Sequence, residues 1–126
     1  MGQPTPISAN VLSTLSAYRI VRFNTAGSYT VAYPSAATVP VHGVTLDTVL
    51  DTTSSIPVQF SGVAKVYFNE TMSSGGLVAS DSSGRGVPHA DTTAGSYVVG
   101  TLIGPAITAT GTVADVLINP FFKSIP

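Results

Sequence analysis

The residues with the most obvious chemical potential lie between positions 80 and 91. Ser80, Ser82 and Ser83 precede His89, and Asp91 follows it. Serine, histidine and aspartate are the residue types of a nucleophilic triad, in which histidine accepts the proton of the attacking hydroxyl. Serine is abundant throughout this chain, however, and no GxSxG elbow presents one of these hydroxyls for attack. A small serine hydrolase using Ser80 or Ser82 with His89 is therefore the third and least favoured function, and we expect no catalytic residue.

Histidine and carboxylates also occur together around position 42, where they raise the question of a metal site. His42 is followed by Asp47 and Asp51, but the HExxH spacing is missing. Residues 81–86 (DSSGRG) lack the alternating oxygen ligands of a calcium loop. Residues 83–86 (SGRG) are not followed by the GK[ST] of a phosphate loop. We interpret the aspartates as turn residues and residues 83–86 as a hairpin tip, and we expect no metal and no cofactor.

The composition describes a single domain with an almost uncharged surface. The chain has 126 residues, of which 9% are charged and 44% hydrophobic, and its net charge is -1. Ordinary soluble domains are about 25% charged, and a neutral surface resists association poorly. We therefore expect part of the surface to be buried in a homo-oligomer, with a trimer favoured over a dimer. The five basic and six acidic residues form no basic stripe, which argues against nucleic-acid binding.

The absence of cysteine and of long apolar runs removes other classes of site. With no cysteine, the chain has no disulfide, no thiolate nucleophile and no cysteine metal ligand. No apolar run approaches the roughly 20 residues that span a bilayer, and the N-terminus does not read as a signal peptide. We expect a soluble, unprocessed protein without a membrane partner.

Alternation and glycine turns predict an all-β fold. Residues 62–68 (GVAKVYF) alternate, with Ala64, Val66 and Phe68 as the expected core face. Glycine-rich turns bracket a short strand at residues 77–79. Residues 18–24 and 28–33 predict a hairpin. The predicted fold is a small antiparallel barrel or sandwich.

The ends of the chain are predicted to lie outside this β-domain. We expect an extended N-terminal arm over residues 1–17, a β-domain over 18–119 and a C-terminal tail over 120–126. Two prolines make the start of the arm unsuitable for a sheet. The spacing of Val11, Leu12 and Leu15 leaves helix and strand both open for residues 7–17.

An internal echo suggests two similar β-units. Residues 42–46 (HGVTL) precede 56–60 (IPVQF), and residues 99–103 (VGTLI) precede 113–117 (VADVL), with the same offset between the glycine and the second strand in both. A glycine within a strand often marks a close backbone approach. The recurrence of TAGSY at 25–29 and 93–97 is interpreted instead as two turn-to-strand junctions of similar composition.

The order of these segments resembles the small capsid decoration, or cement, proteins of tailed bacteriophages. The resemblance runs nearly from end to end and is most specific at residues 61–66 (SGVAKV), followed by GGLV at 75–78, SD at 80–81, GR at 84–85, VG at 99–100 and VLI at 116–118. These are structural positions and include no active site. Two departures are His42, where such proteins often have a small or aliphatic residue, and residues 119–122 (NPFF), which extend beyond the expected last strand.

The resemblance implies a barrel-like or tulip-like all-β protein on the outer surface of the virion. Such a protein, made in the host cytoplasm, binds the assembled head as a symmetric oligomer and stabilises it against the internal pressure of packaged DNA. Its partners would be the major capsid protein and other copies of itself. A host-binding or fibre-like virion module is the second function considered, with residues 81–86 and 91–96 as its contact loops.

The two ends of the chain are the expected contact elements. Prolines hold the first segment extended, and two adjacent phenylalanines near the C-terminus are costly to leave in water. The predicted interface residues are Gln3, Pro4, Thr5, Pro6, Ile7, Phe121 and Phe122.

Overall fold

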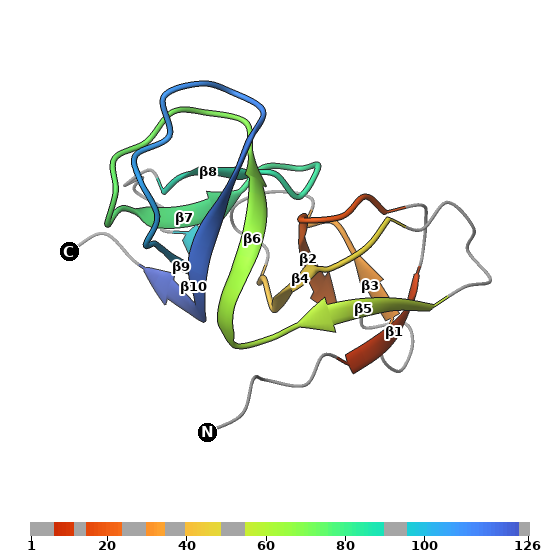
Figure 1. Cartoon of the computed structure of the whole chain (residues 1–126). Helices are drawn as coiled ribbons and strands as arrows, with labels where there is room; N and C mark the ends of the chain where they lie inside the picture. Colours follow the sequence, from red (N-terminus) through yellow and green to blue (C-terminus); the bar gives the residue numbers. More distant parts are fainter. Residues whose placement is uncertain are drawn as a thin grey trace.

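The computed structural model describes residues 7–11, 15–23, 30–34, 40–48, 55–89 and 96–123, and within them it contains ten strands and no helix. The all-β prediction is thus confirmed. The strands form two closed five-stranded barrels that lie side by side (Figure 1). The first barrel is built from β1 (Ile7–Val11), β2 (Ile20–Phe23), β3 (Thr30–Ala32), β4 (Gly43–Thr45) and β5 (Ser55–Gln59). The second is built from β6 (Gly62–Phe68), β7 (Leu77–Ser80), β8 (Gly86–Pro88), β9 (Ser96–Leu102) and β10 (Thr112–Lys123).

The two barrels share one topology. The neighbours in the first are β1-β3-β2-β4-β5, and those in the second are β6-β8-β7-β9-β10, so each strand of the second barrel occupies the place of the strand five positions earlier. In both, the first and third strands pair in parallel and every other pair is antiparallel. The chain is therefore a tandem repeat of one small barrel, as the echo in the sequence predicts.

The glycines of that echo occupy equivalent places. Gly43 is in the fourth strand of the first barrel, and Gly100 is in the fourth strand of the second. A Cβ at Gly43 would lie 2.6 Å from the carbonyl oxygen of Gln59, and one at Gly100 would overlap the carbonyl oxygen of Leu117. Both glycines thus permit a close approach of the fifth strand. The TAGSY segments are not equivalent, because one leads to β3 and the other to β9.

The cores of the two barrels are joined through β2 and β4. In the first barrel, Val21 packs with Ala9, Leu15, Val31, Ile56 and Val58. The adjacent Ile20 faces the other way and packs, with Val41 and Val44, into the core of the second barrel. Ala64, Val66 and Phe68 belong to that second core, as predicted. Because first-barrel residues complete the second core, we expect the barrels to fold as one unit.

The strands extend further toward both ends of the chain than the sequence predicts. β1 lies within the predicted arm, where it pairs with β3 and β5, so residues 7–11 are a strand. β10 runs through the predicted tail to Lys123, with a register shift between Ile118 and Phe121. Proline has no backbone N–H for the ladder, and a bulge accommodates Pro120 within the strand. The alternation of the sequence is interrupted at Pro120, so the predicted β-domain ended at residue 119. The strand pairing resumes beyond the proline, and β10 continues to Lys123.

Candidate interaction surface

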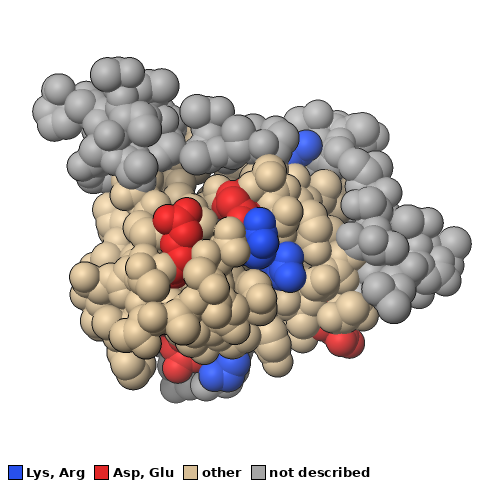
Figure 2. Space-filling model, turned by 90° about the horizontal axis from the view of Figure 1, so that it is seen from above, with Lys and Arg blue, Asp and Glu red and all other residues tan. Residues whose placement is uncertain are grey.

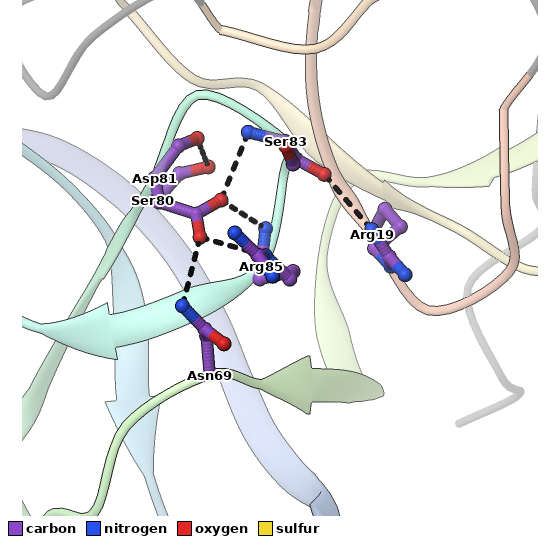
Figure 3. A network of polar contacts seen from close by, with 6 residues as sticks. All are labelled: Arg19, Asn69, Ser80, Asp81, Ser83 and Arg85. Atoms are coloured by element: carbon purple, nitrogen blue, oxygen red, sulfur yellow. Dashed lines mark hydrogen bonds and ion pairs between the residues drawn. The ribbon is translucent and has the colours of Figure 1, made fainter. Parts of the chain in front are cut away.

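The tip of the β7–β8 hairpin, residues 81–85, is organised by the carboxylate of Asp81. Its Oδ1 accepts the backbone N–H groups of Ser83 and Arg85, both at 2.9 Å, and its Oδ2 pairs with the Arg85 Nε at 2.8 Å (Figure 3). The Asn69 side-chain amide also donates to Oδ2, at 3.5 Å. One carboxylate therefore holds both the backbone of the turn and its neighbouring strand end, which is a structural use of the aspartate.

This tip packs against the first barrel. The carbonyl of Gly84 accepts the Ile20 N–H at 2.6 Å. The carbonyl of Ser83 accepts a hydrogen bond from Nη1 of Arg19 at 3.1 Å (Figure 3). The guanidinium carbon of Arg19 also lies 4.8 Å from the centre of the Tyr67 ring, a cation–π contact between the barrels. We call the contacts of residues 81–85 and Tyr67 with residues 18–20 the seam.

The seam also contains a residue, Tyr18, in a backbone conformation that residues other than glycine rarely adopt. Tyr18 has a φ of 62°, a left-handed conformation that costs about 1–2 kcal/mol for a residue other than glycine. Its N–H donates to the Thr45 carbonyl at 2.9 Å, and its carbonyl accepts the Tyr67 N–H at 2.8 Å. These two bonds, one to each barrel, fix the turn that carries Arg19.

The seam corrects the idea that residues 81–86 present a free contact loop. Gly84 and Gly86 are buried, Ser83 is half-buried, and within the tip only Ser82 is well exposed. The backbone of the tip is therefore held by the first barrel, and within the tip only the side chain of Ser82 is open to solvent. Of the second loop considered, residues 91–95 lie outside the described residues and Ser96 begins β9.

Of the two candidate serines, Ser82 is exposed at the hairpin tip, and no contact with His89 is found for it among the described residues. Ser80 is only 3% exposed, and its hydroxyl donates to the carbonyl of Asp81 at 2.8 Å. The backbone N–H of His89 donates to Leu77, which makes His89 part of the β7–β8 ladder. Asp91 lies outside the described residues. The arrangement gives no support to hydrolysis.

His42 serves the packing of the first barrel. Its Nδ1 accepts the N–H of Phe23 at 3.1 Å, and its ring lies 5.5 Å from that of Phe23, which stacks on Phe60 at 5.2 Å. Burial, assisted by the positive charge of Arg22, lowers the pKa of His42 from its usual 6.5. The neutral ring is therefore the favoured form.

Among the residues that the structure describes, no cluster of carboxylates surrounds His42. Oδ1 of Asp47 accepts the N–H of Thr48 at 2.8 Å, and Asp51 lies outside the described residues. Among the described residues, no group of three histidine, cysteine, aspartate or glutamate side chains could hold a metal ion.

The predicted interface residues are only partly placed. Gln3, Pro4, Thr5 and Pro6 lie outside the described residues. Ile7 is the first residue of β1 and pairs with Val58. Phe121 and Phe122 pair with Val98 and Tyr97, and the side chain of Phe121 is 39% exposed.

Several exposed apolar side chains lie on the outside of the second barrel, where β6 and β10 pair. Val63 is opposite Leu117 and Lys65 is opposite Asp115. Leu117 and Val63 are among the most exposed large apolar side chains of the described residues, as are Ile103 and Val113. The last two lie next to Asp115: the Ile103 N–H donates to the Asp115 carbonyl, and Val113 is two residues before Asp115 on β10. We call Val63, Lys65, Ile103, Val113, Asp115 and Leu117 the outer face.

The outer face carries one positive and one negative side chain, and the two form an ion pair. Nζ of Lys65 lies 3.1 Å from Oδ1 of Asp115, and both side chains are well exposed. These two residues, with Pro105 and Ile107, line a hollow of about 230 Å³ beside the strands. Figure 2 shows charged side chains of both signs scattered over a largely uncharged surface. The sequence analysis missed this face, although alternation with the core residues 64, 66 and 68 already placed residues 63 and 65 outside.

The comparisons with known proteins identify the fold. No protein-family model matches the sequence, and no curated protein sequence matches it. The structure is similar to the crystal structure of the N base of the head fibre protein gp8.5 of bacteriophage phi29, with a TM-score of 0.70. The match covers 90% of this chain and 92% of the other at 17% sequence identity. At this identity the likeness establishes a shared fold. The described residues contain no helix capable of spanning a bilayer.

Proposed function

We propose that this protein is a structural component of a bacteriophage head, which binds the outer surface of the assembled capsid as a homo-oligomer and stabilises it against the pressure of packaged DNA. The observation that carries the proposal is the likeness to a phage head fibre base over nearly the full length of both chains. The finer part of the proposal, a decoration protein that stabilises the head, follows the resemblance noted in the sequence.

The physical character of the chain agrees with a binding role. Ser80 is buried and His89 belongs to the β7–β8 ladder, while an apolar face with balanced charge is left exposed. Many copies linked in one shell gain strength through effective concentration, so that individually weak contacts suffice. A ligand that binds only the assembled shell shifts the equilibrium away from dissociated subunits. Stabilisation of the head then requires no chemical step.

The ends of the chain remain proposed contact elements. Gln3, Pro4, Thr5 and Pro6 precede β1, and their two prolines favour an extended segment that could lie across a neighbouring subunit. Ile7 begins β1 and pairs with Val58, while Phe122 lies within β10 opposite Tyr97. The exposed side chain of Phe121 is available to a partner.

A fibre-like module that contacts the host is the second candidate. It is favoured by one specific observation, which is that the similar structure is the base of a head fibre. A base can anchor a longer fibre, and this candidate requires binding to cells in addition to binding to heads.

The test uses heads of the phage that encodes the protein, prepared from a deletion strain. We expect added protein to co-sediment with these heads at a saturating copy number and to raise the temperature at which DNA becomes accessible to a dye. Heads of an unrelated phage are the control. Absence of binding would overturn the proposal, and binding without any increase in the DNA-release temperature would overturn its stabilising part. Binding of the same protein to host cells but not to heads would favour the second candidate.

A further inference from the structure

Because the two barrels share one topology, the outer face of the second barrel can be compared with the equivalent positions of the first. Pro57 is opposite Ser8 in the first barrel, at the place where Asp115 is opposite Lys65 in the second. The outward positions Ser55, Pro57 and Gln59 of β5 therefore correspond to Val113, Asp115 and Leu117 of β10. One copy of the fold forms with serine, proline and glutamine at these positions, so the barrel itself does not require valine and leucine there.

The exposure of this face is a cost that a partner would remove. Leu117 is 44% exposed and Val63 is 49% exposed, directly opposite each other on neighbouring strands. Contiguous exposed apolar side chains in a soluble protein mark interaction sites. Charged residues are only 9% of the chain, yet Lys65 and Asp115 form an ion pair within this apolar surface.

We propose that the outer face is where two copies of this chain pair, related by a twofold axis that runs along the strands between β6 and β10. This inference rests on the homo-oligomeric part of the proposed function and assigns a surface to it. It places the contact on the second barrel and on the same strand, β10, as the predicted contact residues Phe121 and Phe122.

The charges of Lys65 and Asp115 favour an axis along the strands over one across them. A twofold axis along the strands places Lys65 of each copy over Asp115 of the other and Val63 over Leu117. An axis across the strands would instead place Lys65 on Lys65 and Asp115 on Asp115. Like charges in contact oppose association, and complementary ones fix the register of an interface. The face is therefore self-complementary in one orientation, which is the requirement of an isologous contact.

The ion pair and the hollow would fix how the two copies align along their strands. In the isolated chain, Lys65 and Asp115 are 60% and 46% exposed, and an exposed pair contributes little to stability. Across the twofold axis, the four side chains would form a ring of alternating charge. The hollow beside Asp115, lined by Pro105 and Ile107, provides room for the aliphatic part of Lys65 from the second copy.

The decisive experiment uses two charge variants, separately and mixed. Lys65→Glu makes the face wholly acidic, and Asp115→Lys makes it wholly basic. We expect the wild-type protein to sediment at twice its chain mass at micromolar concentration, and each variant alone to associate at least tenfold more weakly. An equimolar mixture of the two variants should restore association as a mixed pair, because each acidic face then meets a basic one.

Two further variants separate an interface effect from a folding effect. Leu117→Ser should weaken self-association at least tenfold while the thermal unfolding of the dilute chain changes little. Ser55→Glu introduces a charge at the equivalent of Val113 on the first barrel and should leave association unchanged. Circular dichroism of each variant establishes that it has retained its strands.

The outcomes are unambiguous. A wild-type chain that remains a monomer of 12.8 kDa at the highest soluble concentration would overturn the inference. So would a trimer, the order expected from composition, since a trimer has no twofold axis. Failure of the mixed variants to associate when the wild type does would also overturn it. None of these results depends on heads, so the binding assay still decides the proposed function separately.

Discussion

The carbonyl oxygen of Gly84, at the tip of the β7–β8 hairpin, accepts a 2.6 Å hydrogen bond from the backbone N–H of Ile20 in the first barrel. The side chain of Ile20 is fully buried in the core of the second barrel. A single residue of β2 is thus held by the second barrel through both its backbone and its side chain. This relationship makes the hairpin tip part of the internal structure.

Replacing Gly84 by alanine should destabilise the protein strongly. Gly84 has a φ of +75°, and an added Cβ would lie 2.6 Å from the Ile20 carbonyl oxygen. Gly75 is the matched control, with a φ of +82° and open space around the added Cβ. We expect Gly75→Ala to cost only the left-handed strain of about 1–2 kcal/mol, and Gly84→Ala at least about twice as much. Urea unfolding of both variants measures the difference, and equal losses would argue against close packing at the seam.

Removal of the Asp81 carboxylate should loosen the hairpin tip. Asp81→Ala eliminates the acceptor for two backbone N–H groups, the Arg85 guanidinium and the Asn69 amide. Since hydrogen bonds to a charged group contribute about 1.5–3 kcal/mol each and are not additive, we expect a loss of about 2–4 kcal/mol. Asp47→Ala, at an exposed turn, should cost less than about 1 kcal/mol. Amide hydrogen exchange at Ser83 and Arg85 should accelerate in the first variant only; unchanged exchange there would contradict the assignment.

His42 should make stability depend on pH. Its pKa is lowered in the folded protein by burial and by Arg22, from 6.5. The unfolded chain therefore binds the proton more tightly than the folded chain, so this stabilisation is complete above pH 6.5 and is lost as pH falls toward the folded pKa. Asparagine at position 42 can still accept the Phe23 N–H, but it does not titrate. We expect the free energy of unfolding of His42→Asn to fall less than that of the wild type between pH 7 and 5, and parallel curves would contradict this role.

A chain that ends after Asn119 should melt at a lower temperature. It loses the pairing of Phe121, Phe122 and Lys123 with β9. Three cross-strand pairs at about 0.2–1 kcal/mol each predict a loss of about 1–3 kcal/mol. A chain that ends after Lys123 retains these pairs and is the control. An unchanged melting temperature after the shorter truncation would instead favour the role of these residues as contacts with a partner alone.

The sequence by itself determined the all-β class, several of the strands and which of their faces are buried. Alternation is a property of neighbouring residues, so Ala64, Val66 and Phe68 could be assigned to the core from their spacing alone. The same reasoning placed Val63 and Lys65 outside, and the glycine echo at Gly43 and Gly100 indicated two related units.

Only the tertiary structure decided how those strands pair and which surfaces remain free. β1 pairs with β3 and with β5, whose residues are distant in sequence, and β10 resumes its pairing with β9 beyond Pro120. The sequence around Gly84 is that of an ordinary turn. The turn is buried only because Ile20 and Arg19 of the first barrel donate hydrogen bonds to its carbonyl groups. Burial of a turn, closure of a barrel and the juxtaposition of Lys65 with Asp115 all depend on contacts between distant segments, which no local pattern of side chains encodes.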